Sequence, residues 1–255
     1  AVIILKDENK KLTPYIDNKE TTRMSVSVGN LNSLLLNTRL ELNGKALPFQ
    51  HIYRVFNDSS FKSGGRFYGG NYLNLAKAKR KCLVINGTPA TEFDFSTLHP
   101  SILYYEINKP MPKEPYLPIG YNSNERKFLK LFFLRILNSA NEDQAIRAGL
   151  SLASRNFKLL GYNTKAAIKK VLLDLKTHNK LIQKYFCKCE AKRLMYIDSK
   201  IAESVITTFV NQGIPIYPVH DSFIVPTAHA AQLSQVMSDC YKKIVGGSIK
   251  IDKKY

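Results

Sequence analysis

The chain has 255 residues, and 44% of them are hydrophobic, which is enough for a globular core. Lys and Arg number 38 against 20 Asp and Glu, and the resulting charge of +18 favours nucleic acid as a partner, because cationic side chains release counterions from phosphates. A merely basic, ribosome-associated or soluble protein is the alternative on charge alone. No apolar run is long enough to cross a bilayer or to form a signal peptide, so we expect an intracellular protein, cytoplasmic or nucleoid-associated, without a membrane partner.

Residues 1–60 are polar, and we expect this part of the chain to be irregular. Because the first residue is Ala rather than Met, we also expect a longer protein with a companion domain or a replication protein as partner. In residues 64–70, four glycines surround Arg66 and two aromatic residues. Glycine lets a backbone approach a ligand closely, so this segment predicts a loop in which Arg66 contacts phosphate or a primer strand. A plain flexible turn is the other interpretation.

Two β-prone runs, 81–85 and 91–95, are separated by Asn86-Gly87, a strong reversal signal. They predict a hairpin that ends near Asp94. Pro100 suits the first turn of a following helix, so Asp94 is expected where a strand passes into a helix. An Asp in this position is also a common helix cap.

Residues 123–210 predict four helices, with caps at Ser123 or Asn124, at Ser139 with Glu142, and at Asn163 or Thr164. In the first of these helices, the side chains that recur every four residues share one face, and they are Arg126, Lys130, Leu134 and Asn138. This cationic face could hold a triphosphate, although a basic helix face is often simply solvated.

After Gly213, residues 214–219 and 223–225 predict two strands joined at His220-Asp221-Ser222. A polar β-turn accounts for these residues equally well. If Asp94 and Asp221 converge, however, they form a paired-carboxylate site for two Mg²⁺ ions, with Mn²⁺ as a substitute. We therefore expect an α+β fold in which an antiparallel sheet carries two acidic strands, with a helical insertion between them.

Residues 64–226 resemble the palm and fingers of family A DNA polymerases and of the related single-subunit phage-type RNA polymerases. The similarity rests on Arg66, Asn74 and Arg80, then on Asp94-Phe95-Ser96 in a D-x-S pattern, then on a basic helix, and finally on His220-Asp221. It implies that Asp94 and Asp221 bind metal, that His220, Arg66 and Arg80 lie along the primer-template, and that Arg126 and Lys130 neutralise the incoming triphosphate. Lys130 would also protonate pyrophosphate, and Ser96, His99 and Asn138 would complete the nucleotide site. Asn138 and Ser139 stand where the family has tyrosine and glycine, which is a departure from its fingers helix.

The resemblance also implies a division into a reduced thumb-like region (1–60), a first palm part (61–122), a fingers-like insertion (123–200) and a second palm part (201–255). Ser222 after Asp221 is similar to the RNA polymerases, whereas a bulky His99 five residues after Asp94 would exclude a ribose 2′-hydroxyl. We weigh the steric effect more heavily and predict a compact DNA polymerase without proofreading. Glu92 would be a third ligand or a base. An RNA polymerase or primase, a metal-dependent nuclease and a non-catalytic nucleic-acid-binding replication module are the alternatives.

Overall fold

A seven-stranded sheet carries both acidic segments. The computed structural model describes all 255 residues, and the strands of this sheet follow the spatial order β3-β2-β6-β7-β9-β8, with β10 also paired to β7. All of its pairings are antiparallel. The strands are β2 (Leu40–Leu42), β3 (Lys45–Ala46), β6 (Leu83–Ile85), β7 (Thr88–Phe95), β8 (Tyr217–Val219), β9 (Ser222–Pro226) and β10 (Ile251–Lys253). The α+β class with an antiparallel sheet is confirmed.

Two tight hairpins set the register of this sheet. Asn86 and Gly87 both have positive φ, 48° and 78°, and join β6 to β7 with Ile85 opposite Thr88. A two-residue turn with two left-handed residues matches the twist of the flanking strands, which is why Asn-Gly predicted it correctly. His220 and Asp221 form the second two-residue connection, with Val219 opposite Ser222.

A smaller sheet of three strands has the order β1-β4-β5 and is formed by β1 (Ile3–Leu5), β4 (Ile52–Asn57) and β5 (Ser60–Gly69). The predicted glycine-rich loop is therefore wrong, because most of residues 64–70 belong to β5. These glycines serve packing and a β-bulge: a Cβ on Gly65 would lie 2.6 Å from the ring of Phe56, and one on Gly69 would lie 1.9 Å from the carbonyl oxygen of His51.

The irregular structure expected for residues 1–60 is also wrong, since α1 (Lys19–Leu36) is an 18-residue helix. The side chain of Asn18 accepts hydrogen bonds from the backbone of Glu20 and Thr21 and so caps its first turn. The residues that α1 buries recur at helical spacing within a polar sequence, and they include Met24, Val28, Leu31 and Leu35.

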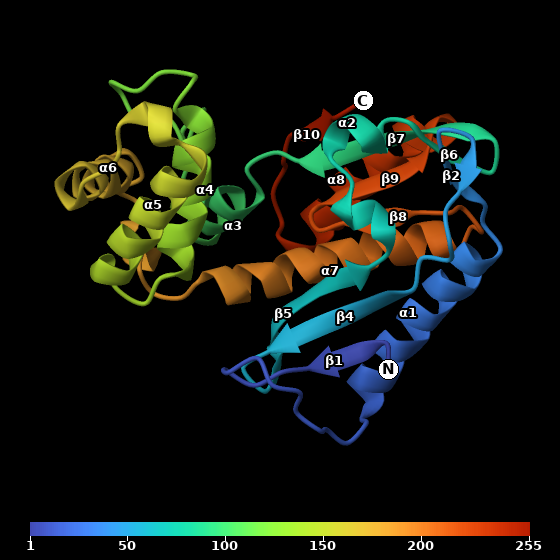
Figure 1. The fold of residues 1–255 in the computed structure, drawn as a ribbon. Helices are drawn as coiled ribbons and strands as arrows, with labels where there is room; N and C mark the ends of the chain where they lie inside the picture. Colours follow the sequence, from blue (N-terminus) through green and yellow to red (C-terminus); the bar gives the residue numbers. More distant parts are fainter. The chain divides into compact units, whose positions relative to one another are not determined.

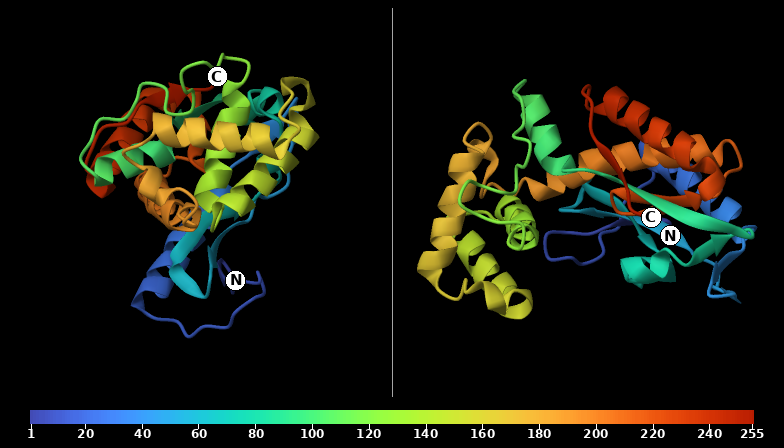
Figure 2. Two further views of the ribbon diagram at one scale, coloured as in Figure 1. Left: turned by 90° about the vertical axis from the view of Figure 1, so that its left-hand side faces the viewer. Right: turned by 90° about the horizontal axis from the view of Figure 1, so that it is seen from above.

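Residues 1–98 and 195–255 form one compact unit, here called the sheet unit. It contains both sheets, α1, the short helix α2 (Lys77–Arg80), most of α7 (Ala191–Val210) and α8 (Ala230–Ile244) (Figures 1 and 2). The ring of Tyr241 on α8 lies 6.1 Å from that of Phe95, so α8 covers the face of β7 opposite Asp94. The predicted end of α7 before Gly213 is confirmed.

Residues 99–194 form the second compact unit, here called the helical unit. Its helices are α3 (Leu98–Glu106), α4 (Arg126–Asn138), α5 (Glu142–Asn156) and α6 (Lys165–His178). None of the helices in the chain is both long enough and apolar enough to pass through a bilayer.

The four helices predicted between 123 and 210 are confirmed, but two of their caps are wrong. α4 follows Glu125 without a side-chain cap, and Asn141 caps α5 by accepting from the backbone of Gln144. Ser139 is not a cap because its hydroxyl donates to the carbonyl oxygen of Arg135 instead. Thr164 caps α6 as predicted.

Candidate active site

The sheet brings Asp94 and Asp221 together. Asp94 on β7 lies directly opposite Ser222 on β9, the residue that follows Asp221. The backbone N–H of Phe95 points at the carbonyl oxygen of Asp221 over a long 3.5 Å hydrogen bond. Two acids that are 127 positions apart in the sequence thus lie on adjacent backbone segments.

Backbone strain accompanies both acids. Thr97, three residues after Asp94, has a φ of 53°, and His220, immediately before Asp221, has a φ of 59°. The left-handed region disfavours residues with a Cβ, above all β-branched ones such as Thr97. Eight other non-glycine residues of the chain also have positive φ, among them Cys187 and Cys189, so these two values alone do not mark a site.

A third carboxylate lies beside Asp94, and sequence reasoning missed it. Asp252 on β10 is directly opposite Asp94 on β7. Two neighbouring lysines compensate the like charges: Lys250 pairs with Asp252 at 2.8 Å, and the ammonium of Lys254 pairs with the Asp94 carboxylate. The hydrogen bond from Lys250, aided by one from Ser96, lowers the pKa of Asp252 below its ordinary value. No pattern in the sequence places Asp252 next to Asp94, because only the pairing of β10 with β7 brings them together.

The predicted role of Glu92 as a third ligand or base does not suit its surroundings. Its side chain is only 3% exposed, and it accepts bidentate hydrogen bonds from Arg80 at 2.8 and 3.0 Å and one from the Ser222 hydroxyl at 2.9 Å. Arg80, predicted to contact nucleic acid, thereby has its guanidinium directed to Glu92 and to the carbonyl of Leu75. Nowhere in residues 1–255 do three or more His, Cys, Asp or Glu side chains gather as a potential metal cluster.

The donors at this site nevertheless fit magnesium. Mg²⁺ is commonly held by one or two carboxylates, with water and substrate phosphates completing its coordination. Asp94 and Asp221 supply hard oxygen atoms of this kind, and Asp94 already attracts a cation in the form of the Lys254 ammonium. Asp94 and Asp221 are the side chains that would hold the metal.

Arg66 lies next to this site and is bound to an acid that sequence reasoning missed. Its Nε donates to both carboxylate oxygens of Asp198 on α7, at 3.0 and 3.2 Å. Burial alone would lower the pKa of Arg66, but the charges of Asp198 and Asp221 raise it above its ordinary value. The nucleic-acid contact predicted for Arg66 would therefore involve a guanidinium that is partly neutralised.

A second arginine network lies further inside the sheet unit. Arg54 on β4 is 1% exposed, and it pairs with Glu203 of α7 at 3.0 Å and donates to the carbonyl of Gly65 at 2.8 Å. Its guanidinium also lies 5.0 and 4.9 Å from the ring centroids of Phe56 and Phe67. Burial lowers the pKa of Arg54, which Glu203 partly offsets. This network holds α7 against the small sheet.

Aromatic rings lie beside Asp221. The ring of His220 meets that of Tyr68 edge to face at 6.0 Å, and Tyr68 stacks with Tyr53 at 6.3 Å. Partial desolvation, followed by the charge of Arg66, lowers the pKa of His220 below its ordinary value.

In the helical unit, α4 buries its apolar face and presents the predicted cationic face on the other side. Lys130 and Arg126 both lie 5.9 Å from the ring of Tyr116, and Arg126 also pairs with Glu114 at 2.8 Å. Asn138 is exposed at the end of α4. His99, the predicted barrier to ribose, is only 7% exposed, so a sugar could contact only a small part of its ring.

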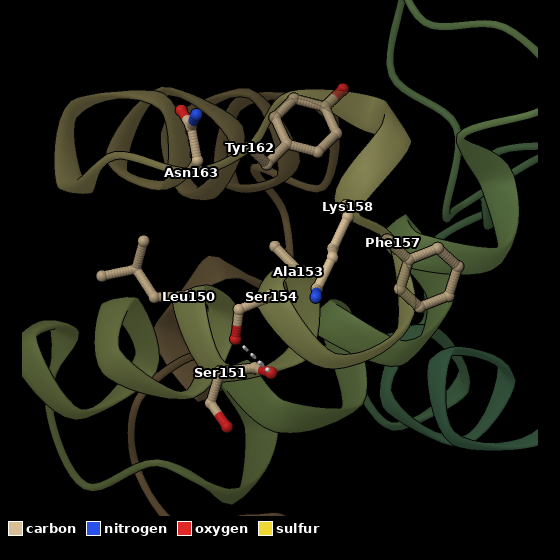
Figure 3. A pocket seen from close by; sticks show the side chains of 8 residues that line it. All are labelled: Leu150, Ser151, Ala153, Ser154, Phe157, Lys158, Tyr162 and Asn163. Atoms are coloured by element: carbon tan, nitrogen blue, oxygen red, sulfur yellow. Dashed lines mark hydrogen bonds between the residues drawn. The ribbon is translucent and has the colours of Figure 1, made fainter.

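A pocket of about 520 Å³ in the helical unit contains none of the predicted site residues (Figure 3). The end of α5 and the following turn line it, with Leu150, Ser154, Phe157, Lys158 and Tyr162 among the lining residues. The Ser154 hydroxyl donates to the carbonyl of Ser151 at 3.2 Å, so this polar group is already used locally.

Comparisons with known proteins do not assign this chain to a family. No family model and no curated protein matches the sequence. Among solved structures, the chain is similar to the POL domain of Pol1 from M. smegmatis in complex with DNA primer-template and dNTP. The TM-score is 0.47 and the identity 11%, and the match covers 92% of this chain and 51% of that one. The chain thus spans about half the length of that structure.

Proposed function

We propose that this protein is a nucleotidyltransferase, a compact template-directed DNA polymerase that adds deoxynucleotides to a primer 3′ end. The observation that supports the proposal is that Asp221, in the turn between β8 and β9, accepts through its backbone carbonyl a hydrogen bond from the N–H of Phe95, the residue after Asp94. The net charge of +18 supports a nucleic-acid substrate independently of these two residues.

Each group has a distinct role in this proposal. Asp94 and Asp221 hold Mg²⁺, which when bound would activate the primer hydroxyl and stabilise charge on the leaving pyrophosphate. Lys130 and Arg126 bind the triphosphate of the nucleotide, since both are cations on one face of α4. His220 lies beside the primer end.

Deoxyribonucleotides are the proposed substrate because of the size of His99, of which the 7% that is exposed is the part that would have to exclude a 2′-hydroxyl. Ser222 suggested ribonucleotides. Its hydroxyl, however, lies within hydrogen-bond distance of the Glu92 carboxylate and the Val219 carbonyl, so a structural role accounts for serine at this position. An RNA polymerase or primase is the alternative within the same chemistry.

A second candidate function is a non-catalytic nucleic-acid-binding replication module. One observation favours it: the Asp94 carboxylate is tied to the ammonium of Lys254. A carboxylate that is permanently neutralised in this way would be unavailable to a metal ion.

Incubation of the protein with end-labelled primer-template, Mg²⁺ and either dNTPs or NTPs separates these functions on one gel. A polymerase extends the primer with dNTPs, and the reaction stops when EDTA is added. Extension with NTPs alone would identify an RNA polymerase, shortening a nuclease, and retention without any change of length a binding module. The last two results would each overturn the proposal.

A further inference from the structure

The pocket at the end of α5 has largely apolar walls. Its volume is about 520 Å³, and Leu150, Ala153 and Phe157 form its apolar part (Figure 3). A volume of this order is typical of ligand sites. Leu159, which follows the lining residue Lys158, is fully exposed. An apolar hollow next to an exposed apolar side chain indicates a surface that another molecule covers.

The segment that forms this pocket carries charge of one sign. Residues 144–173 include six Lys and Arg and no Asp or Glu. Lys158 lines the pocket itself. Arg147 and Arg155 lie one helical turn before and after the lining residue Ser151, so they share its side of α5, and both are exposed. A ligand that fills the pocket therefore passes a positively charged rim, which favours an anionic molecule.

The polar groups of the pocket are largely committed within the protein. The Ser154 hydroxyl donates to the Ser151 carbonyl oxygen, and the Tyr162 hydroxyl donates to the carboxylate of Glu125. The ring of Phe128 covers one face of Tyr162, at 4.8 Å with an interplanar angle of 19°. A nucleobase would leave the polar atoms of its edge with few partners here, and it would find only part of a stacking surface. An aliphatic or aromatic side chain has no such polar edge, so the pocket favours a peptide over a base.

We propose that this pocket is the docking site for an acidic segment of a partner protein. Large apolar side chains of that segment enter the pocket, and carboxylates on either side of them meet Arg147, Arg155 and Lys158. Apolar burial supplies the affinity in this arrangement, whereas the complementary charges steer the encounter and select the partner. Every residue that carries this proposal belongs to the helical unit and lies outside the candidate active site, so the docking site serves a polymerase and a binding module alike.

Fluorescence anisotropy with fluorescein-labelled peptides tests the proposal. The probe is a short peptide in which Leu and Phe stand between runs of Asp and Glu, and it should bind with a Kd below about 100 µM. Two matched peptides separate the contributions: one replaces Leu and Phe by Ser, and the other replaces Asp and Glu by Asn and Gln. Each should bind at least about tenfold more weakly, since it lacks either the apolar or the ionic contacts. Weaker binding of the probe, or equal binding of either matched peptide, would overturn the proposal.

Two variants test whether the probe lies in the pocket. Ser154→Trp fills the hollow from an exposed position on α5 and should weaken binding of the probe by at least about tenfold. Lys158→Glu should weaken it by about three- to tenfold, because attraction at the rim is replaced by repulsion. Lys180→Glu is the matched control, since it changes the charge of the same unit equally at an exposed position that does not line the pocket. Its affinity for the probe should stay within about twofold of that of the unchanged protein.

Fluorescein-labelled single-stranded oligothymidylate, measured with the same variants, distinguishes a nucleic-acid site. Because nucleic acid binds the basic surface as a whole, Ser154→Trp should change its affinity by less than about twofold. A larger loss with oligothymidylate than with the probe would assign the pocket to nucleic acid and overturn the proposal. Unchanged affinity of Ser154→Trp for the probe would also overturn it. Melting curves check that each variant is folded, and Lys158→Glu decides the outcome if Ser154→Trp is not.

Discussion

The two units of the chain use their charges differently. In the sheet unit, three arginines near the candidate site, Arg54, Arg66 and Arg80, are largely buried and directed at Glu203, Asp198 and Glu92. In the helical unit, residues 99–194 contain 18 Lys and Arg against 7 Asp and Glu, a net charge of +11, compared with +7 for the larger sheet unit. Much of the positive charge of the protein is therefore concentrated in its smaller part.

Because the arginines of the sheet unit are paired with carboxylates of the protein, an arginine near an acidic site is not by itself evidence of a phosphate contact. Removing one partner of a buried ion pair leaves an uncompensated charge in a medium of low dielectric constant. The buried arginines are therefore needed for the stability of the fold. The Lys and Arg side chains of the helical unit are mostly solvated. Replacing one of them should therefore change the free energy of unfolding of the protein little.

The largest effect should come from the carboxylates of the sheet unit. Asp94→Asn and Asp221→Asn should each reduce primer extension by at least about a hundredfold, because each removes an ionised ligand without changing its size. Binding of primer-template, measured by anisotropy, should stay within about twofold, since the basic surface provides most of the affinity. Full extension activity in either variant would remove the mechanism.

Arg54 and Arg23 share Glu203 but differ in burial, which makes them a matched pair for stability. Arg54→Met should lower the free energy of unfolding by about 3–5 kcal/mol, because Glu203 loses its buried partner. The side chain of Arg23 is 60% exposed, so Arg23→Met should lower the free energy of unfolding by less than about 1 kcal/mol. Urea denaturation measures both values, and equal losses would show that burial does not distinguish these two arginines.

The cationic face of α4 should affect nucleotide binding rather than stability. Lys130→Ala is expected to raise the KM for dNTP by about ten- to a hundredfold through the loss of one charged contact to phosphate. The melting temperature should not change. Lys127→Ala, an exposed lysine on the same helix, is the control, and an equal rise of KM in that variant would indicate a general effect of charge.

His99, at the beginning of the helical unit, tests sugar selection. His99→Ala should increase extension with NTPs relative to dNTPs by about tenfold, because a smaller side chain leaves room for a 2′-hydroxyl. The ratio of the two rates in one preparation corrects for any loss of stability. An unchanged ratio would be consistent with the burial of this ring and would contradict its role as a barrier.

The smallest effect should come from Lys254. Replacing it by Met removes the ammonium that competes for Asp94, so half-maximal extension should require about two- to fivefold less Mg²⁺. Lys253→Met changes the net charge equally but leaves this ion pair in place, and its Mg²⁺ requirement should not change. A higher requirement in Lys254→Met would mean that Lys254 supports the metal site.

Local patterns predicted much of this protein. The Asn86-Gly87 turn, the four helices after residue 123 and the hairpin at His220-Asp221 each depend on a few neighbouring residues, and all three are confirmed. The glycine-rich sequence of β5 predicted a loop. In the structure these glycines serve a bulge and close packing against β4 and α7, which are distant in the sequence.

The sequence by itself determined that two acids stand at strand ends, that a basic helix lies between them and that the protein carries a large positive charge. Only the tertiary structure decided which groups meet: Asp252 opposite Asp94, Asp198 against Arg66, and Tyr68 against His220. The reason is physical. Turns and helices arise from contacts within a few residues, whereas the partners of a charged or aromatic side chain are set by strand register and helix packing between segments far apart in the chain.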